Sequence, residues 1–302
     1  MRLSRWLPGL VAIVLAASPA SADVLRVATF NVFHGGADSG LKGDAARLDR
    51  RLEMAVDELR RVDADIIGLQ EASAGRDRGN VAARMAQALG LHHAWAPATR
   101  RVFFWPLGRI ITFLMNFDEG PAVLSRFPIV ATAVHDLPAC AKRIDPRVAL
   151  EARLATPWGE VAVFSTHTSR DECQVRRVAD IVHSRRGRRL TIVTGDLNTP
   201  ETSPVIAALT DGGGFVDAFR AANPSAPGPT VWQRIDAEES TVRRRVDYVF
   251  LLPGNGAGPR VRESRVILDS PLREPGGATL WPSDHYGVLA ELELAPVTTA
   301  AE

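Results

Sequence analysis

The sequence predicts an α/β fold with two β-sheets packed face to face and helices on the outside. Apolar runs of strand length recur from residue 24 to residue 294. Some are joined by short turns, as in antiparallel hairpins, and others are separated by segments of helical periodicity, as in strand–helix–strand units. Together the two patterns indicate two mixed sheets, which need a layer of helices on each outer face.

The first part of the chain alternates strand and helix. Residues 24–32 and 64–69 are closely apolar and are typical of buried strands, the second of the parallel type. Between them, apolar residues at helical spacing in 48–59 predict an amphipathic helix. Residues 81–89 predict a second helix, which Gly90 ends.

The middle of the chain adds strands joined by turns. Residues 122–124 and 129–134 are predicted strands on either side of a short connection. Residues 148–154 alternate apolar and charged side chains, which predicts a half-buried strand. A turn at 157–159 returns the chain into a strand at 161–165.

The last part of the chain completes both sheets. The predicted elements are a helix at 175–182, a strand at 190–193, a short helix at 205–209, a loop at 223–230 and strands at 246–252 and 287–294. We expect residues 23–296 to form one domain, because the candidate site residues named below span nearly all of it. Residues 297–302 are expected to be a short tail.

The N-terminus is typical of a secretory signal peptide. Arg2 and Arg5 precede an apolar run at 7–17, and small residues at 20–22 form a cleavage site. We therefore expect residues 1–22 to be removed and the protein to be exported, to the periplasm or out of the cell. A retained membrane anchor is the alternative, but the run is shorter than the about 20 residues that span a bilayer.

The charge balance argues against strong general binding of nucleic acid. The full chain has 36 basic and 35 acidic residues. Removing the expected signal peptide takes away Arg2 and Arg5, which leaves 34 basic and 35 acidic residues. Nonspecific affinity for nucleic acid depends on neutralising phosphates with basic residues, and this chain has no excess of them. Basic clusters at 185–189 and 243–245 are interpreted as solvated surface.

Two cysteines, Cys140 and Cys173, flank the predicted hairpin of residues 148–165. In an oxidising compartment such a pair favours a disulfide, with two unpaired thiols as the alternative. Structural zinc sites use four ligands, so two cysteines alone do not indicate one.

Side chains that can bind a metal or transfer a proton stand where several apolar runs end. Glu71 follows the strand at 64–69, and Asp196 and Asn198 follow the strand at 190–193. Oxygen ligands at strand ends suit a hard divalent cation, Mg²⁺ or Mn²⁺. The alternatives are a surface glutamate for Glu71 and a turn or helix cap for the other two.

Two histidines have surroundings that suit catalysis. His167 and His285 stand beside small polar residues at the ends of strands, where an imidazole could donate to a phosphoryl oxygen or assist a leaving oxygen. Asp247 could orient one of the rings. The other histidines are expected at ordinary surface or core positions; they are His34, His92, His93, His135 and His183.

Two further polar residues are weaker candidates. Asn31 ends the first strand and could brace Asp196 or a metal ligand, or could be a turn residue. Arg147 precedes a strand and could hold a substrate phosphate through its planar donors, or could be a solvated arginine.

The order of these motifs resembles that of the endonuclease/exonuclease/phosphatase superfamily over about residues 24–294. That superfamily includes deoxyribonuclease I, inositol-polyphosphate 5-phosphatases and neutral sphingomyelinases. The segment at 120–129 is also similar to one that is common in it. The motifs that carry the resemblance are Thr29-Phe30-Asn31, Leu69-Gln70-Glu71, Thr166-His167, Gly195-Asp196-Leu197-Asn198, Asp247-Tyr248 and Ser283-Asp284-His285.

The resemblance implies a four-layer α/β/β/α sandwich and an Mg²⁺-dependent phosphoester hydrolase that works by in-line displacement, with Mn²⁺ as an alternative ion. Carried over by position, Glu71 binds the metal, with Asn31 and Asp284 near it. Some abasic-site enzymes of the superfamily have an acidic residue two positions after the motif asparagine, where this chain has Phe33. That departure weakens a role in DNA repair.

The resemblance also implies roles for the remaining site residues. Asp196 would activate or position the attacking water, with Asn198 beside it. His285, paired with Asp247, would stabilise the pentacovalent phosphorus. His167 would assist at the phosphate or at the leaving group.

The substrate is less well determined by sequence. Residues 102–117 contain four Phe and one Trp, which predicts either an apolar loop that touches a lipid surface or a core strand. We expect a monomer that hydrolyses a lipid or a small phosphoester. The alternatives are a secreted endonuclease acting on DNA or RNA and an inert binding module on the same fold.

Overall fold

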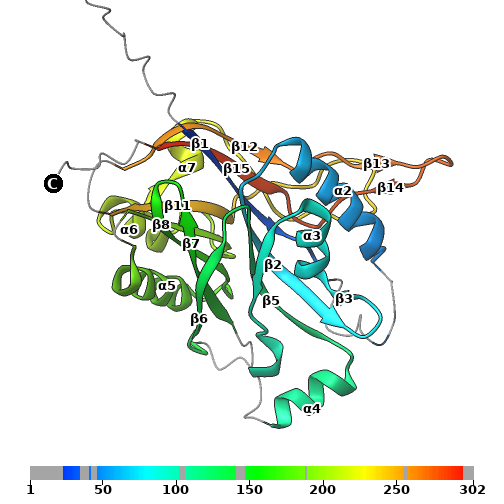
Figure 1. Ribbon diagram of the computed structural model, residues 1–302. Coiled ribbons are helices and arrows are strands. Elements are labelled where there is room, and N and C mark those ends of the chain that lie inside the picture. The colour runs from blue at the N-terminus through cyan, green and yellow to red at the C-terminus, as the bar shows by residue number, and fades with distance from the viewer. Residues whose placement is uncertain are drawn as a thin grey trace, which may run out of the picture.

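The computed structural model describes residues 23–34, 41, 46–101, 106–140, 147–187, 189–254 and 258–294. The predicted signal peptide and C-terminal tail lie outside these residues. Two mixed β-sheets face each other, and helices cover both outer faces (Figure 1). The predicted four-layer α/β/β/α sandwich is therefore confirmed.

The first sheet has seven strands in the order β12-β15-β1-β2-β5-β4, with β3 paired to β2. β1 and β2 are parallel, and the other pairs are antiparallel. The strands are β1 (Asp23–Asn31), β2 (Ile66–Gly75), β3 (Gly79–Asn80), β4 (His92–Trp95), β5 (Asp118–Ser125), β12 (Arg260–Ile267) and β15 (Gly287–Leu294).

The second sheet has six strands in the order β10-β11-β9-β8-β7-β6. Its single parallel pair is β8 and β9, which α5 connects. The strands are β6 (Ile129–Asp136), β7 (Val148–Thr156), β8 (Gly159–His167), β9 (Leu190–Asp196), β10 (Val216–Asp217) and β11 (Asp247–Pro253). A separate small ribbon is formed by β13 (Leu272–Arg273) and β14 (Thr279–Leu280).

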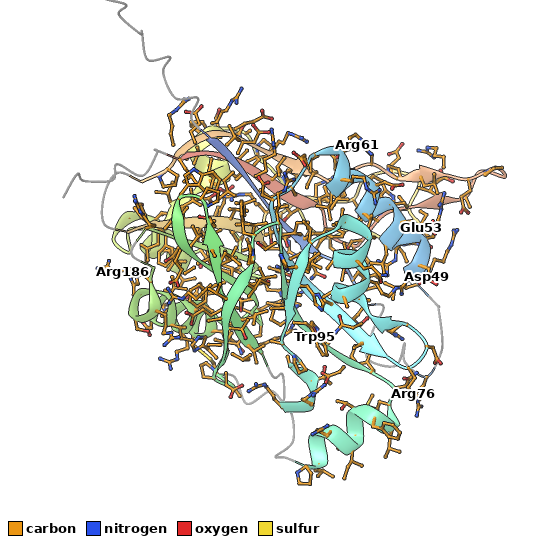
Figure 2. All side chains as sticks on the ribbon, in the orientation of Figure 1. Asp49, Glu53, Arg61, Arg76, Trp95 and Arg186 are labelled. Atoms are coloured by element: carbon orange, nitrogen blue, oxygen red, sulfur yellow. A yellow bond between two sulfur atoms is a disulfide. The ribbon has the colours of Figure 1, made fainter. Side chains whose placement is uncertain are left out.

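The helices divide between the two outer faces. α2 (Leu48–Arg61) and α3 (Val81–Leu89) pack their apolar sides on the first sheet. Figure 2 shows the charged residues Asp49, Glu53 and Arg61 of α2 on its other side. α5 (Glu172–Arg185) and α6 (Pro204–Asp211) pack on the second sheet. The remaining helices are η1 (Thr99–Arg101), α4 (Leu107–Leu114) and α7 (Ala218–Ala222).

The layer between the sheets changes from apolar to polar along the strands. In β1, Leu25 and Val27 belong to the inter-sheet core, and the alternation of the strand places Thr29 and Asn31 on the same face. Gln70 of β2 lies within hydrogen-bond distance of Thr29 and of Ser165 in the opposite sheet. One end of the sandwich interior is therefore polar, and this is where the candidate site lies.

The connection at 126–128 does more than join two strands. β5 belongs to the first sheet and β6 to the second, so these residues carry the chain from one sheet to the other. Sequence spacing alone gives two adjacent strands here and does not reveal the change of sheet.

Two further expectations are settled by the structure. Cys140 and Cys173 form a disulfide with a Cα–Cα separation of 6.3 Å, so the predicted pairing is confirmed. The reading of residues 102–117 as a core strand is wrong, because 107–114 form the exposed helix α4. Residues 102–105 lie outside the described part of the chain. In the part that is described, the helices are all too short or too polar to cross a bilayer.

The two sheets approach closely where Gly68 of β2 faces Thr194 of β9. A Cβ atom at position 68 would overlap the Thr194 side chain, whose hydroxyl donates to the carbonyl of Phe164. Glycine is required here by contact across the sheets.

We therefore expect Gly68→Ala to destabilise the protein by roughly 1–3 kcal/mol, the usual cost of overpacking a core. Chemical denaturation would measure the change in the free energy of unfolding. Gly212→Ala is the matched control, because the added Cβ would meet only a carbonyl oxygen 3.9 Å away. The control should stay within about 0.5 kcal/mol of the wild type. Equal stability of the two variants would contradict the packing argument.

Candidate active site

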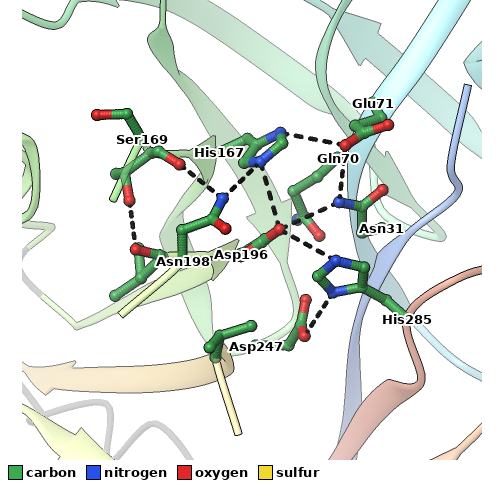
Figure 3. Close-up of polar contacts among 12 residues, drawn as sticks. Asn31, Gln70, Glu71, His167, Ser169, Asp196, Asn198, Asp247 and His285 are labelled. Atoms are coloured by element: carbon green, nitrogen blue, oxygen red, sulfur yellow. Dashed lines mark hydrogen bonds and ion pairs between the residues drawn. The ribbon is translucent and has the colours of Figure 1, made fainter. Parts of the chain in front are cut away.

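The candidate site is built on neighbouring strand ends that the sheet register aligns. His167 of β8 pairs with Asp196 of β9, and Asp196 pairs with Asp247 of β11. Asn31 ends β1 in the facing sheet, and His285 precedes β15. Figure 3 shows these side chains converging from both sheets.

Asp196 is the centre of this arrangement. Its Oδ2 accepts a hydrogen bond from Asn31 Nδ2 at 3.1 Å and lies 3.3 Å from His167 Nε2 and 3.6 Å from His285 Nε2. Its Oδ1 accepts from the backbone N–H of Asn198 at 2.8 Å. The side chain is almost completely buried, and this burial raises the pKa of Asp196 above its usual range.

His285 is held by Asp247. His285 Nδ1 lies 2.9 Å from Asp247 Oδ2, which confirms the predicted pair. Burial disfavours the imidazolium, but the carboxylates of Asp247 and Asp196 outweigh it and hold the pKa of His285 well above its usual range. The other oxygen of Asp247, Oδ1, is buried and has no hydrogen-bond partner among the described residues.

His167 has the opposite electrostatic environment. Burial and the neighbouring Arg147 guanidinium hold the pKa of His167 well below its usual range. Arg147 Nη1 lies 2.6 Å from His167 Nδ1, and an arginine can only donate. On the other side of the ring, Nε2 lies 3.3 Å from Asp196 Oδ2 and 2.9 Å from Asn198 Nδ2.

Glu71 reaches the site through a β-bulge. The register between β2 and β5 shifts between Leu69 and Ala72, and Glu71 has a left-handed backbone with φ 55°. Glu71 Oε1 accepts from Asn31 Nδ2 at 3.2 Å. Burial opposes its charge, but the nearby imidazoles, led by His34, lower the pKa of Glu71 to about 2.

Left-handed backbone recurs at the site in residues other than glycine. Phe33 has φ 53° and Asn198 has φ 48°, in addition to Glu71. Such conformations cost of order 1–3 kcal/mol each and persist where the surrounding structure enforces them. They aim the backbone N–H of Asn198 at Asp196 and that of His34 at Glu71.

His34 corrects the sequence prediction. It was expected at an ordinary position, but its backbone N–H donates to Glu71 Oε2 at 3.2 Å and its Nε2 lies 3.1 Å from the same oxygen. The turn at Phe33 brings it there. Its position three residues after Asn31 was the available signal.

The donors present fit a divalent cation. Glu71 and Asp284 both line the cleft, and burial together with the neighbouring Glu71 carboxylate raises the pKa of Asp284 to about 6. Two carboxylates in one cleft repel each other, and a hard cation bound between them would remove that repulsion. Asn31 turns its Nδ2 toward Glu71 and Asp196, while its Oδ1 accepts from Phe33 N. In this arrangement Asn31 braces the carboxylates, and its role as a ligand stays a prediction.

A second group of possible ligands lies deeper. Ligand atoms of Asp196, Asp247 and His285 lie within 4.8 Å of one another. Asp247 and His285 already pair with each other, so we assign this group to proton handling first.

The cleft has a volume of about 490 Å³. Asn31 contacts Asp196, and Asp247 contacts His285, but neither Asn31 nor Asp247 lines the cleft. The predicted site residues that line the cleft are Glu71, Arg147, His167, Asp196, Asn198, Asp284 and His285. Three exposed residues at its margin were not predicted as site residues: Arg170, Trp232 and Arg244. Arg244 belongs to the basic cluster at 243–245, which was interpreted as solvated surface. That interpretation is wrong for Arg245, which is buried and pairs with Asp217 and Glu201, and Arg244 borders the cleft.

Arg51 of α2 positions the loops on one side of the site. Its fully buried guanidinium donates to the carbonyls of Val32 at 2.8 Å, Phe33 at 2.7 Å and Pro282 at 3.0 Å. These carbonyls belong to the segments that carry Asn31 and His285. One side chain from the helical layer therefore fixes two loops that sequence separates widely.

Comparison with known proteins agrees with this geometry. The model of the Endonuclease/Exonuclease/phosphatase family matches residues 28–285. A search of curated proteins gave no significant match.

Solved structures share the fold at low sequence identity. A mannosyl-6-phosphatase from Bacteroides thetaiotaomicron is 20% identical, with a TM-score of 0.67 over 89% of this chain and 100% of that one. An endonuclease/exonuclease/phosphatase from Beutenbergia cavernae is 24% identical, with a TM-score of 0.66 over 90% and 72%. TDP2 from Caenorhabditis elegans is 17% identical, with a TM-score of 0.64 over 93% and 77%. The family model matches most of the chain, and the shared fold brings the motif residues to one cleft. This protein therefore belongs to the endonuclease/exonuclease/phosphatase family of metal-dependent phosphoester hydrolases.

Proposed function

We propose that this protein is an exported phosphoesterase that uses Mg²⁺, or Mn²⁺, and acts as a monomer on a lipid or small-molecule phosphoester. The observation that supports it best is the convergence on Asp196 Oδ2 of Asn31, His167 and His285 beside the Glu71 and Asp284 carboxylates. A buried acceptor surrounded by donors and next to two carboxylates suits in-line attack of water on phosphorus.

In the proposed reaction Asp196 holds the attacking water and accepts its proton. Its buried environment and raised pKa suit a base better than an exposed aspartate would. Asn31 and the backbone N–H of Asn198 fix the carboxylate in one orientation. Asn198 Nδ2 donates to the carbonyl of Thr168, which holds the amide at the cleft.

The two histidines have different proposed tasks. His285 carries positive charge, supported by Asp247, and stabilises the negative charge that develops on the phosphoryl oxygens. His167, whose pKa burial and Arg147 hold below its usual range, assists at the phosphate or at the leaving oxygen. A bound divalent cation at Glu71 and Asp284 would supply Lewis-acid polarisation of the phosphoryl group.

The cleft margin supports an anionic substrate of moderate size. Arg147, Arg170 and Arg244 line the cleft and can pair with phosphate oxygens. Trp232, whose side chain is 53% exposed, offers a flat apolar face beside them. One structural neighbour is a mannosyl-6-phosphatase, which is consistent with a small phosphoester as substrate.

A secreted endonuclease is the second candidate. The same three arginines could contact a nucleic-acid backbone, and the Trp232 ring could stack on a base. The near-neutral charge of the whole chain favours the first candidate over this one.

Asp196→Ala and His285→Ala are each expected to abolish hydrolysis, with kcat falling by at least about 10²-fold, because each removes a proposed proton-handling or charge-stabilising group. Asp196→Asn and His285→Gln keep side-chain size and guard against misfolding. Turnover of bis(p-nitrophenyl) phosphate and thermal unfolding would be measured together. His92→Ala, at an exposed position on β4, is the control and should keep wild-type turnover. Near-wild-type activity in any of the four site variants would refute its assigned role.

Chelation by EDTA should stop hydrolysis, and Mg²⁺ or Mn²⁺ should restore it. A cation that binds only the folded state at a hundred times its Kd stabilises that state by about 2.7 kcal/mol, so Tm should rise with metal concentration. Glu71→Gln should weaken this shift because it removes a charged ligand. Glu238→Gln, at an exposed position far along the sequence, should behave as the wild type. An identical metal-dependent Tm in Glu71→Gln would place the ion elsewhere.

The two candidate functions predict different substrate profiles. The first predicts release of phosphate or headgroup from sphingomyelin, phosphatidylinositol phosphates or sugar phosphates in the presence of Mg²⁺, with slower nicking of supercoiled plasmid. The second predicts the reverse order of kcat/KM. Asp196→Asn, assayed in parallel, would show whether each activity belongs to the cleft.

A further inference from the structure

We propose that α4 is a docking helix that places this protein on an anionic lipid bilayer. The docking surface consists of the outward side chains of α4 and the groove beside it. Its binding to lipid does not depend on hydrolysis, but the consequence for substrate choice rests on the proposed function.

α4 turns its apolar side chains away from the protein. Leu107, Ile110, Phe113 and Leu114 are 38%, 51%, 62% and 65% exposed, whereas Gly108 and Thr112 face inward. These four are among nine large apolar side chains that are exposed in the described part of the chain, so almost half of them lie on one eight-residue helix. A helix in this orientation leaves most of its apolar side exposed to solvent in the described fold.

The helix also stands apart from the rest of the fold. Figure 1 shows α4 protruding from one end of the sandwich, beyond the edges of both sheets. An eight-residue helix is about 12 Å long, which is far too short to cross a bilayer. Its geometry suits an element that lies in the interface between headgroups and acyl chains.

The charges beside α4 favour anionic headgroups. A groove of about 380 Å³ runs along the helix and is lined by Arg76, Arg100 and Arg109, while its one carboxylate, Asp118, already pairs with Arg100 at 2.6 Å. α4 itself has no acidic residue. Figure 2 shows Arg76 beside the helix, and its guanidinium lies 5.0 Å from the centre of the Phe113 ring. On a bilayer, the apolar side chains of α4 would contact acyl chains, and the neighbouring arginines would pair with phosphate headgroups.

Neighbouring charges do not reverse this sign. Arg101 pairs with Asp136 on β6, and Asp77 accepts a hydrogen bond from Asn116 Nδ2 at 2.8 Å. Arg78 lies over the Phe117 ring at 5.7 Å. Five arginines lie around α4 against these three aspartates and Glu119, and Glu119 interacts with His34 and Arg147 of the cleft, so the surface at α4 stays positive.

Contacts connect the docking surface to the cleft. Phe117 follows α4, and its ring meets the His34 ring edge-on with centroids 5.0 Å apart. His34 in turn contacts Glu71, which lines the cleft. A bilayer bound at α4 would therefore lie near the cleft, so a lipid phosphoester could enter from the membrane surface.

The test is sedimentation with lipid vesicles, using protein expressed from the full-length gene and purified in the form that the cell produces. The wild type should bind vesicles that contain phosphatidylglycerol more tightly than vesicles of phosphatidylcholine alone, and added salt should weaken that preference. The double variant Ile110→Ser/Phe113→Ser should lose at least about tenfold in vesicle affinity, because it removes apolar side chains that would enter the bilayer. Arg76→Gln/Arg109→Gln should lose the preference for anionic vesicles.

The controls separate docking from catalysis and from other occupants. Val130→Ser removes an apolar side chain that is 58% exposed on β6 and should bind vesicles as the wild type does. All variants should hydrolyse a soluble phosphodiester within about twofold of the wild type, since surface changes away from the site have small effects. Absence of vesicle binding, or equal loss with Val130→Ser, would overturn the proposal. Self-association that Ile110→Ser/Phe113→Ser abolishes would show a second copy as the occupant and would also overturn it. Vesicle binding without any hydrolysis would leave docking intact and refute the proposed function.

Discussion

The burial of the Asp196 carboxylate is the constraint on which the candidate site depends. An ion taken out of water must be paired, and leaving one buried and unpaired costs about 3–5 kcal/mol. Here the pairing groups come from β1, β8 and the segment before β15, together with the backbone of Asn198. No short segment could supply them, so the carboxylate is tolerable only when both sheets have closed on each other. The contacts that stabilise the buried carboxylate and the contacts that arrange the site therefore form together, when the two sheets pack.

The packing of the two sheets also gives the imidazoles of His167 and His285 different pKa values. Asp247 faces His285, whereas a guanidinium faces His167, and both rings are buried. In water these neighbours would have small effects, but burial strengthens each of them. The site can therefore present one charged and one neutral imidazole to a phosphate at a single pH, because the strand register sets which neighbour each ring meets.

Much of this arrangement follows from period-two patterns that the sequence displays. In β8 and β9, apolar side chains on the inward face give way to Ser165 and His167, and to Thr194 and Asp196, at the same alternate positions. Nine strands and four helices were predicted for the same reason, whereas β4 and β12 of the first sheet and the short strands β3, β10, β13 and β14 were not. The position of His34 was not, because it depends on a left-handed turn at Phe33. The helical state and outward orientation of α4 were also not predictable, because an apolar segment of that length fits the core equally well until the fold shows the core already filled.

The outer helical layer is part of the site as well as its cover. The Arg51 guanidinium donates to carbonyls on both loops that carry Asn31 and His285, so one side chain of α2 links those loops. Asn31 and His285 both point at one oxygen of Asp196, and a shift of either loop would lengthen its contact. A buried arginine is costly unless its donors are satisfied, and here it is satisfied by carbonyls that only this loop geometry presents. The loop positions that satisfy the donors of Arg51 are thus the same positions that bring Asn31 and His285 to Asp196. Both buried charges therefore stabilise one conformation of the cleft.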